Sequence, residues 1–375
     1  MVKMQAFAPD RVREKIGLLI QQVTPIEIAL SEIGMESKEL LAGCKEYHSF
    51  ICEMLKDMYN NPLEYGFVPG KLETFLDGKE INSFKLTQPK EIKALLTEAD
   101  DGPYSYYRFL YETAIRAEQR TMNLFISPEK YEEIQIQFNN HMKPQKKNKN
   151  FLIDYDIRLA AFTRNGLIIK EVDNGVEISN NKYPQMFGAL LALAKSVSSV
   201  KTFGMQGFYH CEFRMITSQH KPDFNDILQP LSADNKEMMI KFNEIALQGK
   251  MNPSYNTFWK VNYKWKNRQV MQLSIAGKDL TVTVTGAVDE GQRKLLTEYV
   301  KEEDPAFVAL IQDNLTACTG CAYDHIGVII DVFGTPRRVC SNAISVRVRN
   351  PDEKDITFLT KFIEYRKKLI IWSLE

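Results

Sequence analysis

The stretch FWKVNYKWKNRQVMQLSIAGKDLTVTVT, residues 258–285, decides the fold class of this protein. Apolar and polar side chains alternate in three runs, at about 258–265, 269–275 and 280–285. Alternation with a period of two indicates β-strands that bury one face. The runs are separated by Lys266-Asn267 and Gly277-Lys278, which predict tight turns. The stretch therefore predicts an antiparallel meander.

The pattern continues on the C-terminal side of the meander. It predicts a helix at about 289–301, then a hairpin of 326–333 and 337–348, which turns at Gly334-Thr335-Pro336. Asn350-Pro351-Asp352-Glu353 predicts the start of a final helix, because it places acids in the first helical turn.

A similar plan precedes the meander. Asp173-Asn174-Gly175 predicts a hairpin turn, and a helix is expected from Pro184 onward. The segment 208–216 alternates cleanly and predicts a strand. That strand would place His210, Glu212 and Arg214 on one face, either as an acid-base row in a groove or as its solvated side.

The N-terminal part reads as helical, with Thr24-Pro25-Ile26-Glu27 as a capping box. We therefore predict an α+β protein in which an N-terminal helical region precedes two related antiparallel-sheet-plus-helix units. The expected domains are 1–142, a linker at 143–150 (KPQKKNKN), a first unit at 151–250 and a second at 251–375.

Composition narrows the class of protein. The chain has 375 residues, and Lys+Arg and Asp+Glu both number 48, so its formal net charge is zero. This balance makes nucleic acid an unlikely partner, because phosphate neutralisation favours a basic surplus. No apolar run approaches the roughly 18 residues of a spanning helix, and no signal peptide is evident. We expect a cytoplasmic protein without a membrane anchor, whose partner is a small molecule or a protein.

Three cysteines near the C-terminus carry the clearest chemical signal. Cys318, Cys321 and Cys340 follow the spacing C-x2-C-x18-C, and His325 is the nearest candidate for a fourth ligand. This set resembles most of a zinc ribbon, so zinc in a structural role is the expected cofactor. The same thiols fit a redox enzyme, in which one attacks and another resolves a mixed disulfide. They also fit an inert, unligated group.

Several short motifs resemble those of uncharacterised bacterial proteins. They are C-x-G-C at 318–321, FG-x-x-RR-x-C at 333–340, NP-x-x-x-D-I at 350–356, and KYPQMF with FYHCEFR between 182 and 214. That group has no assigned activity, so the resemblance implies a shared fold and a common thiol site only.

Each of the remaining groups of candidate residues fits either a binding role or a structural role. Arg337, Arg338, Arg347 and Arg349 would receive an anion or keep an edge strand from aggregating. Trp259 and Trp265 would line an apolar pocket or pack in the core. A helix at about 104–121, rich in tyrosine and arginine, would stack bases or pack internally, and packing is favoured.

No common nucleotide, hydrolase or metalloprotease motif occurs, so the sequence neither identifies nor excludes an enzyme. The expected function is a cytosolic binding or regulatory protein with a structural zinc site. A thiol-dependent redox enzyme and a nucleic-acid-binding regulator are the alternatives.

Overall fold

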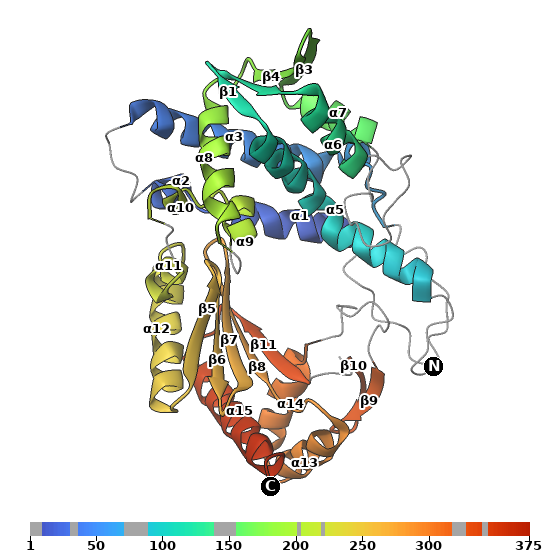
Figure 1. The fold of residues 1–375 in the computed structure, drawn as a ribbon. Helices are drawn as coiled ribbons and strands as arrows, with labels where there is room; N and C mark the ends of the chain where they lie inside the picture. Colours follow the sequence, from blue (N-terminus) through green and yellow to red (C-terminus); the bar gives the residue numbers. More distant parts are fainter. Residues whose placement is uncertain are drawn as a thin grey trace. The chain divides into compact units, whose positions relative to one another are not determined.

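A computed structural model describes residues 10–30, 37–70, 89–138, 155–200, 204–218, 222–316, 328–339 and 344–375. The predicted α+β class is confirmed, since N-terminal helices precede antiparallel sheets that carry helices (Figure 1). The chain forms two compact units. We call the described residues of Ala6–Asp77 and Ala94–Lys221 the N-terminal unit, and those of Pro222–Glu375 the C-terminal unit. The described residues within 10–70 and 94–138 thus share a unit with 155–218, whereas 89–93 and 222–250 belong with the C-terminal residues.

The N-terminal unit is mainly helical. Its elements are α1 (Arg11–Gln22), α2 (Ile26–Ala29), α3 (Lys38–Asn60), η1 (Pro62–Tyr65), α5 (Pro89–Arg116), β1 (Glu118–Arg120), β2 (Asn123–Ile126), α6 (Pro128–Phe138), α7 (Tyr155–Arg164), β3 (Leu167–Val172), β4 (Gly175–Asn180), α8 (Met186–Ser198), α9 (Gly204–Tyr209) and α10 (Arg214–Ser218). The strands form one antiparallel sheet in the order β1-β2-β4-β3.

Glycines set two close approaches in this unit. Gly175 has φ of +151°, and a Cβ there would lie 2.1 Å from the carbonyl oxygen of Ile126. This position, directly after the predicted Asp173-Asn174 turn, therefore requires glycine. A Cβ on Gly43 of α3 would lie 2.6 Å from the carbonyl oxygen of Gln185, so glycine lets α3 pack closely beside the start of α8.

The C-terminal unit is built on the predicted meander. Its elements are α11 (Phe224–Leu228), α12 (Ala233–Gln248), β5 (Asn252–Thr257), β6 (Lys260–Trp265), β7 (Arg268–Ala276), β8 (Asp279–Thr285), α13 (Glu290–Lys301), α14 (Pro305–Asn314), β9 (Val328–Val332), β10 (Thr335–Val339), β11 (Ser345–Arg349) and α15 (Glu353–Trp372). Five strands form an antiparallel sheet in the order β11-β8-β7-β6-β5, and β9 pairs with β10 separately.

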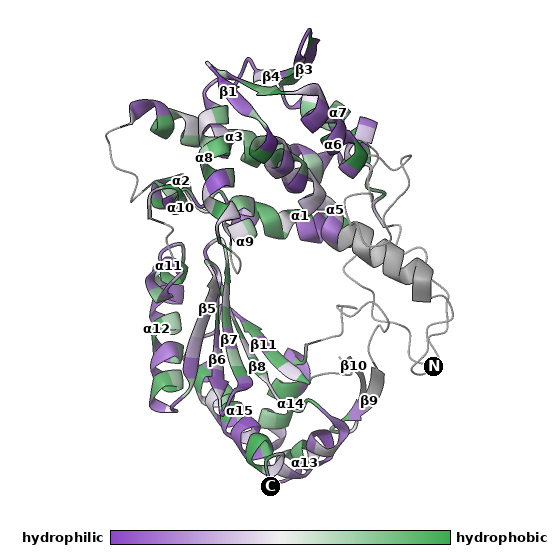
Figure 2. Ribbon diagram, viewed as in Figure 1, coloured by the Kyte–Doolittle hydropathy of each residue, from purple (hydrophilic) through white to green (hydrophobic). Residues whose placement is uncertain are grey.

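One face of the five-stranded sheet is apolar and buried. Val261, Leu273, Val282 and Val348 are paired across β6, β7, β8 and β11, and all are at most 6% exposed. They belong to one core with residues of α12 and α15, whose hydrophobic and hydrophilic residues are both visible in Figure 2. Since alternate side chains point to opposite faces, the polar residues between them lie on the other face.

The sequence misplaced three local features. The expected strand 337–348 is divided between β10 and β11, which belong to different sheets. The strand β5 was not anticipated. Thr24 does not cap α2, whose N-cap is Pro25 without a side-chain hydrogen bond. The predicted start of α15 after Asp352 is confirmed.

Candidate functional site

The predicted thiol site cannot be placed. Cys318, Cys321, His325 and Cys340 lie outside the described residues, so the zinc site stays a prediction. Within the ranges that the structure describes, no group of three His, Cys, Asp or Glu side chains is arranged to hold a metal ion. The described cysteines, Cys44, Cys52 and Cys211, are free thiols.

The predicted strand at 208–216 is wrong, because this segment forms the end of α9, a turn and the start of α10. Cys211 in the turn has φ of +55°, a left-handed conformation that breaks any extended pattern. His210, Glu212 and Arg214 therefore do not share the face of a strand, and of the three side chains Glu212 and Arg214 contact each other. All three are at most 1% exposed, so they form no solvated face.

Glu212 and Arg214 form a bidentate ion pair. Arg214 Nε and Nη2 donate to the two carboxylate oxygens of Glu212 at 2.6 and 2.8 Å. Thr24 Oγ1 donates to the same carboxylate at 3.3 Å, and the Thr24 amide donates to the carbonyl of His210 at 2.8 Å. These contacts fasten the α9–α10 turn to the loop between α1 and α2. We therefore assign this group to folding, since no solvent reaches it.

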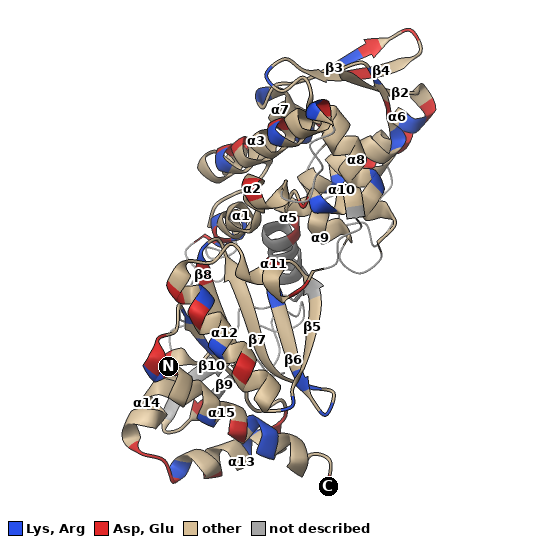
Figure 3. Ribbon diagram, turned by 90° about the vertical axis from the view of Figure 1, so that its left-hand side faces the viewer, with Lys and Arg blue, Asp and Glu red and all other residues tan. Residues whose placement is uncertain are grey.

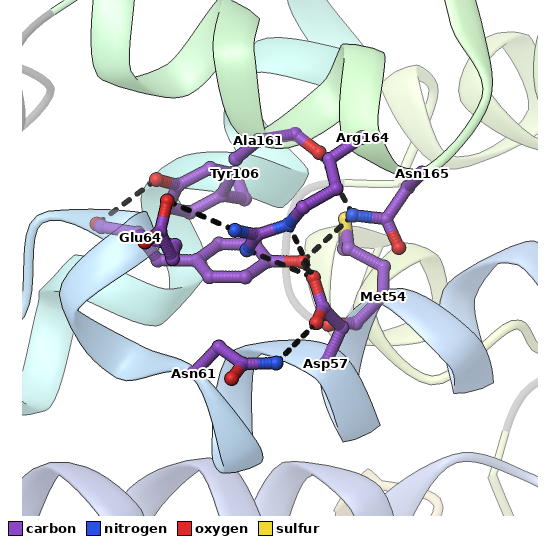
Figure 4. A network of polar contacts seen from close by, with 9 residues as sticks. Met54, Asp57, Asn61, Glu64, Tyr106, Ala161, Arg164 and Asn165 are labelled. Atoms are coloured by element: carbon purple, nitrogen blue, oxygen red, sulfur yellow. Dashed lines mark hydrogen bonds and ion pairs between the residues drawn. The ribbon is translucent and has the colours of Figure 1, made fainter.

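A second polar network, drawn in Figure 4, joins α3, η1 and α7. Tyr65 Oη donates to Asp57 at 2.7 Å, and Arg164 Nε donates to the same carboxylate oxygen at 3.0 Å. Burial opposes ionisation of Asp57, but the hydrogen bonds from Tyr65 and Asn61 together with the charge and hydrogen bond of Arg164 lower its pKa. Asn165 Nδ2 donates to Tyr65 Oη at 2.7 Å. The contacts link protein groups to one another, so this network is structural as well.

The aromatic segment predicted as a helix at 104–121 is helical only as far as Arg116, where α5 ends, and Glu118–Arg120 form β1. Tyr106, Tyr107 and Phe109 on α5 are at most 2% exposed, and the Phe109 ring stacks on Phe162 with centroids 5.1 Å apart. The packing interpretation is confirmed for these rings, which are closed to any base.

The C-terminal arginines differ in what the structure shows. Arg337 and Arg338 lie on β10, and their side chains are outside the described part. Arg347 and Arg349 are exposed on β11. Arg349 forms an ion pair with Asp279, whereas Arg347 has no ion-pair partner among the described residues. Both belong to the polar face of the sheet.

That polar face is the candidate functional site. One row crosses all five strands through directly paired residues: Ser254, Asn262, Gln272, Thr283 and Arg347. A neighbouring row holds Lys260, Ser274, Thr281 and Arg349, and it continues to Thr257 of β5, which is buried. Within the first row, Gln272 Nε2 donates to Asn262 Oδ1 at 2.7 Å. Hydroxyl, amide and cationic groups thus form a continuous hydrogen-bonding surface.

Among its described residues, this face carries an excess of positive charge. Lys260, Lys264 and Arg347 have no ion-pair partner among the residues that the structure describes, while Asp279 is occupied by Arg349 and Asn350. Sequence reasoning identified Arg347 and Arg349 but missed the rest. In 260–264 and 281–285, polar residues alternate with apolar ones. This alternation was the signal that would have identified the other polar residues of the face.

Comparisons with known proteins give no match, whether with family models, curated proteins or solved structures. The resemblance to uncharacterised bacterial proteins therefore stays a prediction. In the described segments, every helix is too short or too polar to cross a membrane.

Proposed function

We propose that this protein is a binding protein whose C-terminal sheet presents its polar face to an acidic polypeptide segment. The observation that supports the proposal is the row from Ser254 to Arg347, which crosses five strands without a carboxylate. Unpaired cations beside hydroxyl and amide groups complement an anionic partner that can both donate and accept hydrogen bonds.

The absence of a stacking platform favours a polypeptide over nucleic acid. The rings of Tyr263, Trp259 and Trp265 pack against the apolar core on the opposite side of the sheet. Single-stranded nucleic acid is held largely by base stacking on exposed aromatic rings, which this face does not offer among its described residues. The formal net charge of zero also favours a polypeptide over nucleic acid as the partner.

The dimensions of the face suit a short segment. Five strands at a spacing of about 4.8 Å span roughly 19 Å, the length of about six extended residues. A contact of this size is below that of a stable protein interface, so we expect weak, salt-sensitive binding. The edge strand β5 carries Pro253 and a bulge between Tyr255 and Thr257, which disfavours added-strand pairing and leaves the face as the docking surface.

Fluorescence anisotropy with a labelled peptide of alternating glutamate and serine tests the proposal. We expect binding that weakens with salt, and Arg347→Glu should weaken it about tenfold, because the substitution reverses an unpaired charge. Lys236→Glu, on the helix α12 that covers the opposite face, is the matched control and should bind like the wild type.

Two results would contradict the proposal. The first is equal peptide binding by Arg347→Glu and the wild type. The second is tighter binding of a single-stranded oligonucleotide of the same charge, which would assign the face to nucleic acid instead.

A further inference from the structure

A second surface of the C-terminal unit forms a groove with its own chemistry. The groove has a volume of about 380 Å³ and lies between the end of α12, the β6–β7 turn and the last turns of α15. Its walls include Lys250, Trp265, Glu364, Lys367, Lys368 and Ile371. This volume is within the range of small-molecule sites, roughly 300 to 1,000 Å³.

Two tight turns bring the groove residues together. At the end of α12, Lys250 has φ of +56° and turns the chain into β5. Between β6 and β7, Lys266 and Asn267 have φ of +48° and +61°, which is the backbone of a two-residue hairpin turn. This turn leaves Trp265 as the last residue of β6, on the side of the sheet that α15 covers. The residues that line the groove are far apart in the sequence, but these turns bring their side chains to one place.

Two lysine ammonium groups lie close to the indole ring of Trp265. Lys266 Nζ and Lys367 Nζ lie 5.0 and 5.9 Å from its ring centroid. Lys250 and Lys368 line the same groove. The basic residues of the β6–β7 turn and of α15 are marked in blue in Figure 3. At these distances each ammonium is attracted to the ring face, and the lysines are held near it.

Among the described residues that line the groove, the lysines outnumber the acidic residues. Glu364 is its one acid, and its Oε1 lies 3.3 Å from Lys367 Nζ. Lys250 has no ion-pair partner among the described residues, and Lys368 contacts the rings of Tyr299 and Tyr365 at 5.4 and 5.5 Å. The groove therefore has an excess of cations around an aromatic and aliphatic floor.

We propose that this groove binds a small planar aromatic anion, such as a nucleoside monophosphate. The ring of the ligand would lie against Trp265 and Ile371, and its anionic group would be held by the ammonium groups of Lys250 and Lys368. Lysine binds phosphate as a point charge and needs no fixed fork geometry, which suits an open groove. Ring and charge are both required, because neither a flat apolar floor nor exposed lysines alone gives useful affinity.

The groove is independent of the polar face. Trp265 lies among the residues packed on the apolar side of the sheet, whereas Arg347 points to the opposite side. The two binding proposals can therefore fail separately.

Calorimetric titration of the full-length protein with adenosine 5′-monophosphate tests the groove. We expect binding that weakens about tenfold in the double variant Lys250→Gln/Lys368→Gln, because the two ammonium groups that would hold the anion are removed. Adenosine and inorganic phosphate, each offering half of the ligand, should bind more weakly than the nucleotide. Lys294→Gln on α13, an exposed lysine outside the groove, is the control and should not change the affinity.

A tryptophan readout accompanies the titration. Nucleotide binding should quench the fluorescence of Trp265, and Trp265→Phe should lose that quenching while keeping an aromatic floor. The proposal is overturned if millimolar nucleotide produces no heat, if the double lysine variant binds like the wild type, or if phosphate alone binds as tightly as the nucleotide. Arg347→Glu should leave nucleotide binding unchanged, which separates this test from that of the polar face.

Discussion

His210 is completely buried, with its Nδ1 only 2.7 Å from the carbonyl oxygen of Gln22. Because a carbonyl only accepts hydrogen bonds, Nδ1 carries the proton in this contact. Burial is the main cause that lowers the pKa of His210, to about 3, so the imidazole is neutral in the folded protein near pH 7. A residue chosen from the sequence as an acid-base candidate is thus a neutral donor inside the N-terminal unit.

We expect the free energy of unfolding to fall as the pH is lowered from about 6.5 towards 3. In that window an unfolded histidine binds a proton that folded His210 does not, so the slope from this residue is at most about 1.4 kcal/mol per pH unit. Urea denaturation at several pH values measures it. His210→Gln should flatten the slope. Burial lowers the pKa of His48 too, so His48→Gln measures its separate share. An unchanged slope in His210→Gln would refute this assignment.

Arg366 shows why a residue's role depends on burial. In the sequence it directly precedes Lys367 and Lys368. In the structure it is 2% exposed and donates to the carbonyls of Gln269 and Gly286 at 3.0 and 2.8 Å. Its pKa falls to about 10, chiefly because of burial. The two neighbouring lysines face the groove instead.

Among the elements, the α9–α10 turn depends on the Glu212–Arg214 pair. Replacing Arg214 with methionine would leave a buried carboxylate without its main partner, and we expect a loss of about 3–5 kcal/mol in the free energy of unfolding. Chemical denaturation measures the loss. The double variant Glu212→Leu/Arg214→Met should recover part of it, because no charge is then left buried. A single variant as stable as the wild type would show that the pair does not hold the turn.

Helices and strands could be predicted where the capping residues and the hydrophobic periodicity indicated the same structure. The start of α15 is one case, since Asp352 forms a capping box with Asp355. The segment 208–216 is the opposite case. Its apolar and polar residues alternate in the sequence, but residues 208–215 are all buried, in and around a turn between two helices. Thr24 likewise resembled a cap, but its hydroxyl is used by Glu212, which is distant in sequence.

For the whole molecule, the division into two compact units predicts two unfolding transitions. Differential scanning calorimetry measures them. Arg214→Met should lower the midpoint of one transition. Phe242→Ala should lower the other, because Phe242 is completely buried in the core of the C-terminal unit and its truncation costs about 3–5 kcal/mol. One transition that both variants shift equally would contradict the division and indicate a single cooperative unit.

The sequence by itself determined the α+β class, the meander of β6, β7 and β8, the span of α13 and the start of α15. These depend on local periodicity and on turn and capping residues, which are contiguous in the chain. Only the tertiary structure decided which polar residues share a face. The row from Ser254 to Arg347 depends on strand pairing between β8 and β11, and the groove around Trp265 depends on α12 and α15 meeting at one turn. Such proximity between distant segments leaves no mark in local periodicity, and a single sequence therefore cannot show it.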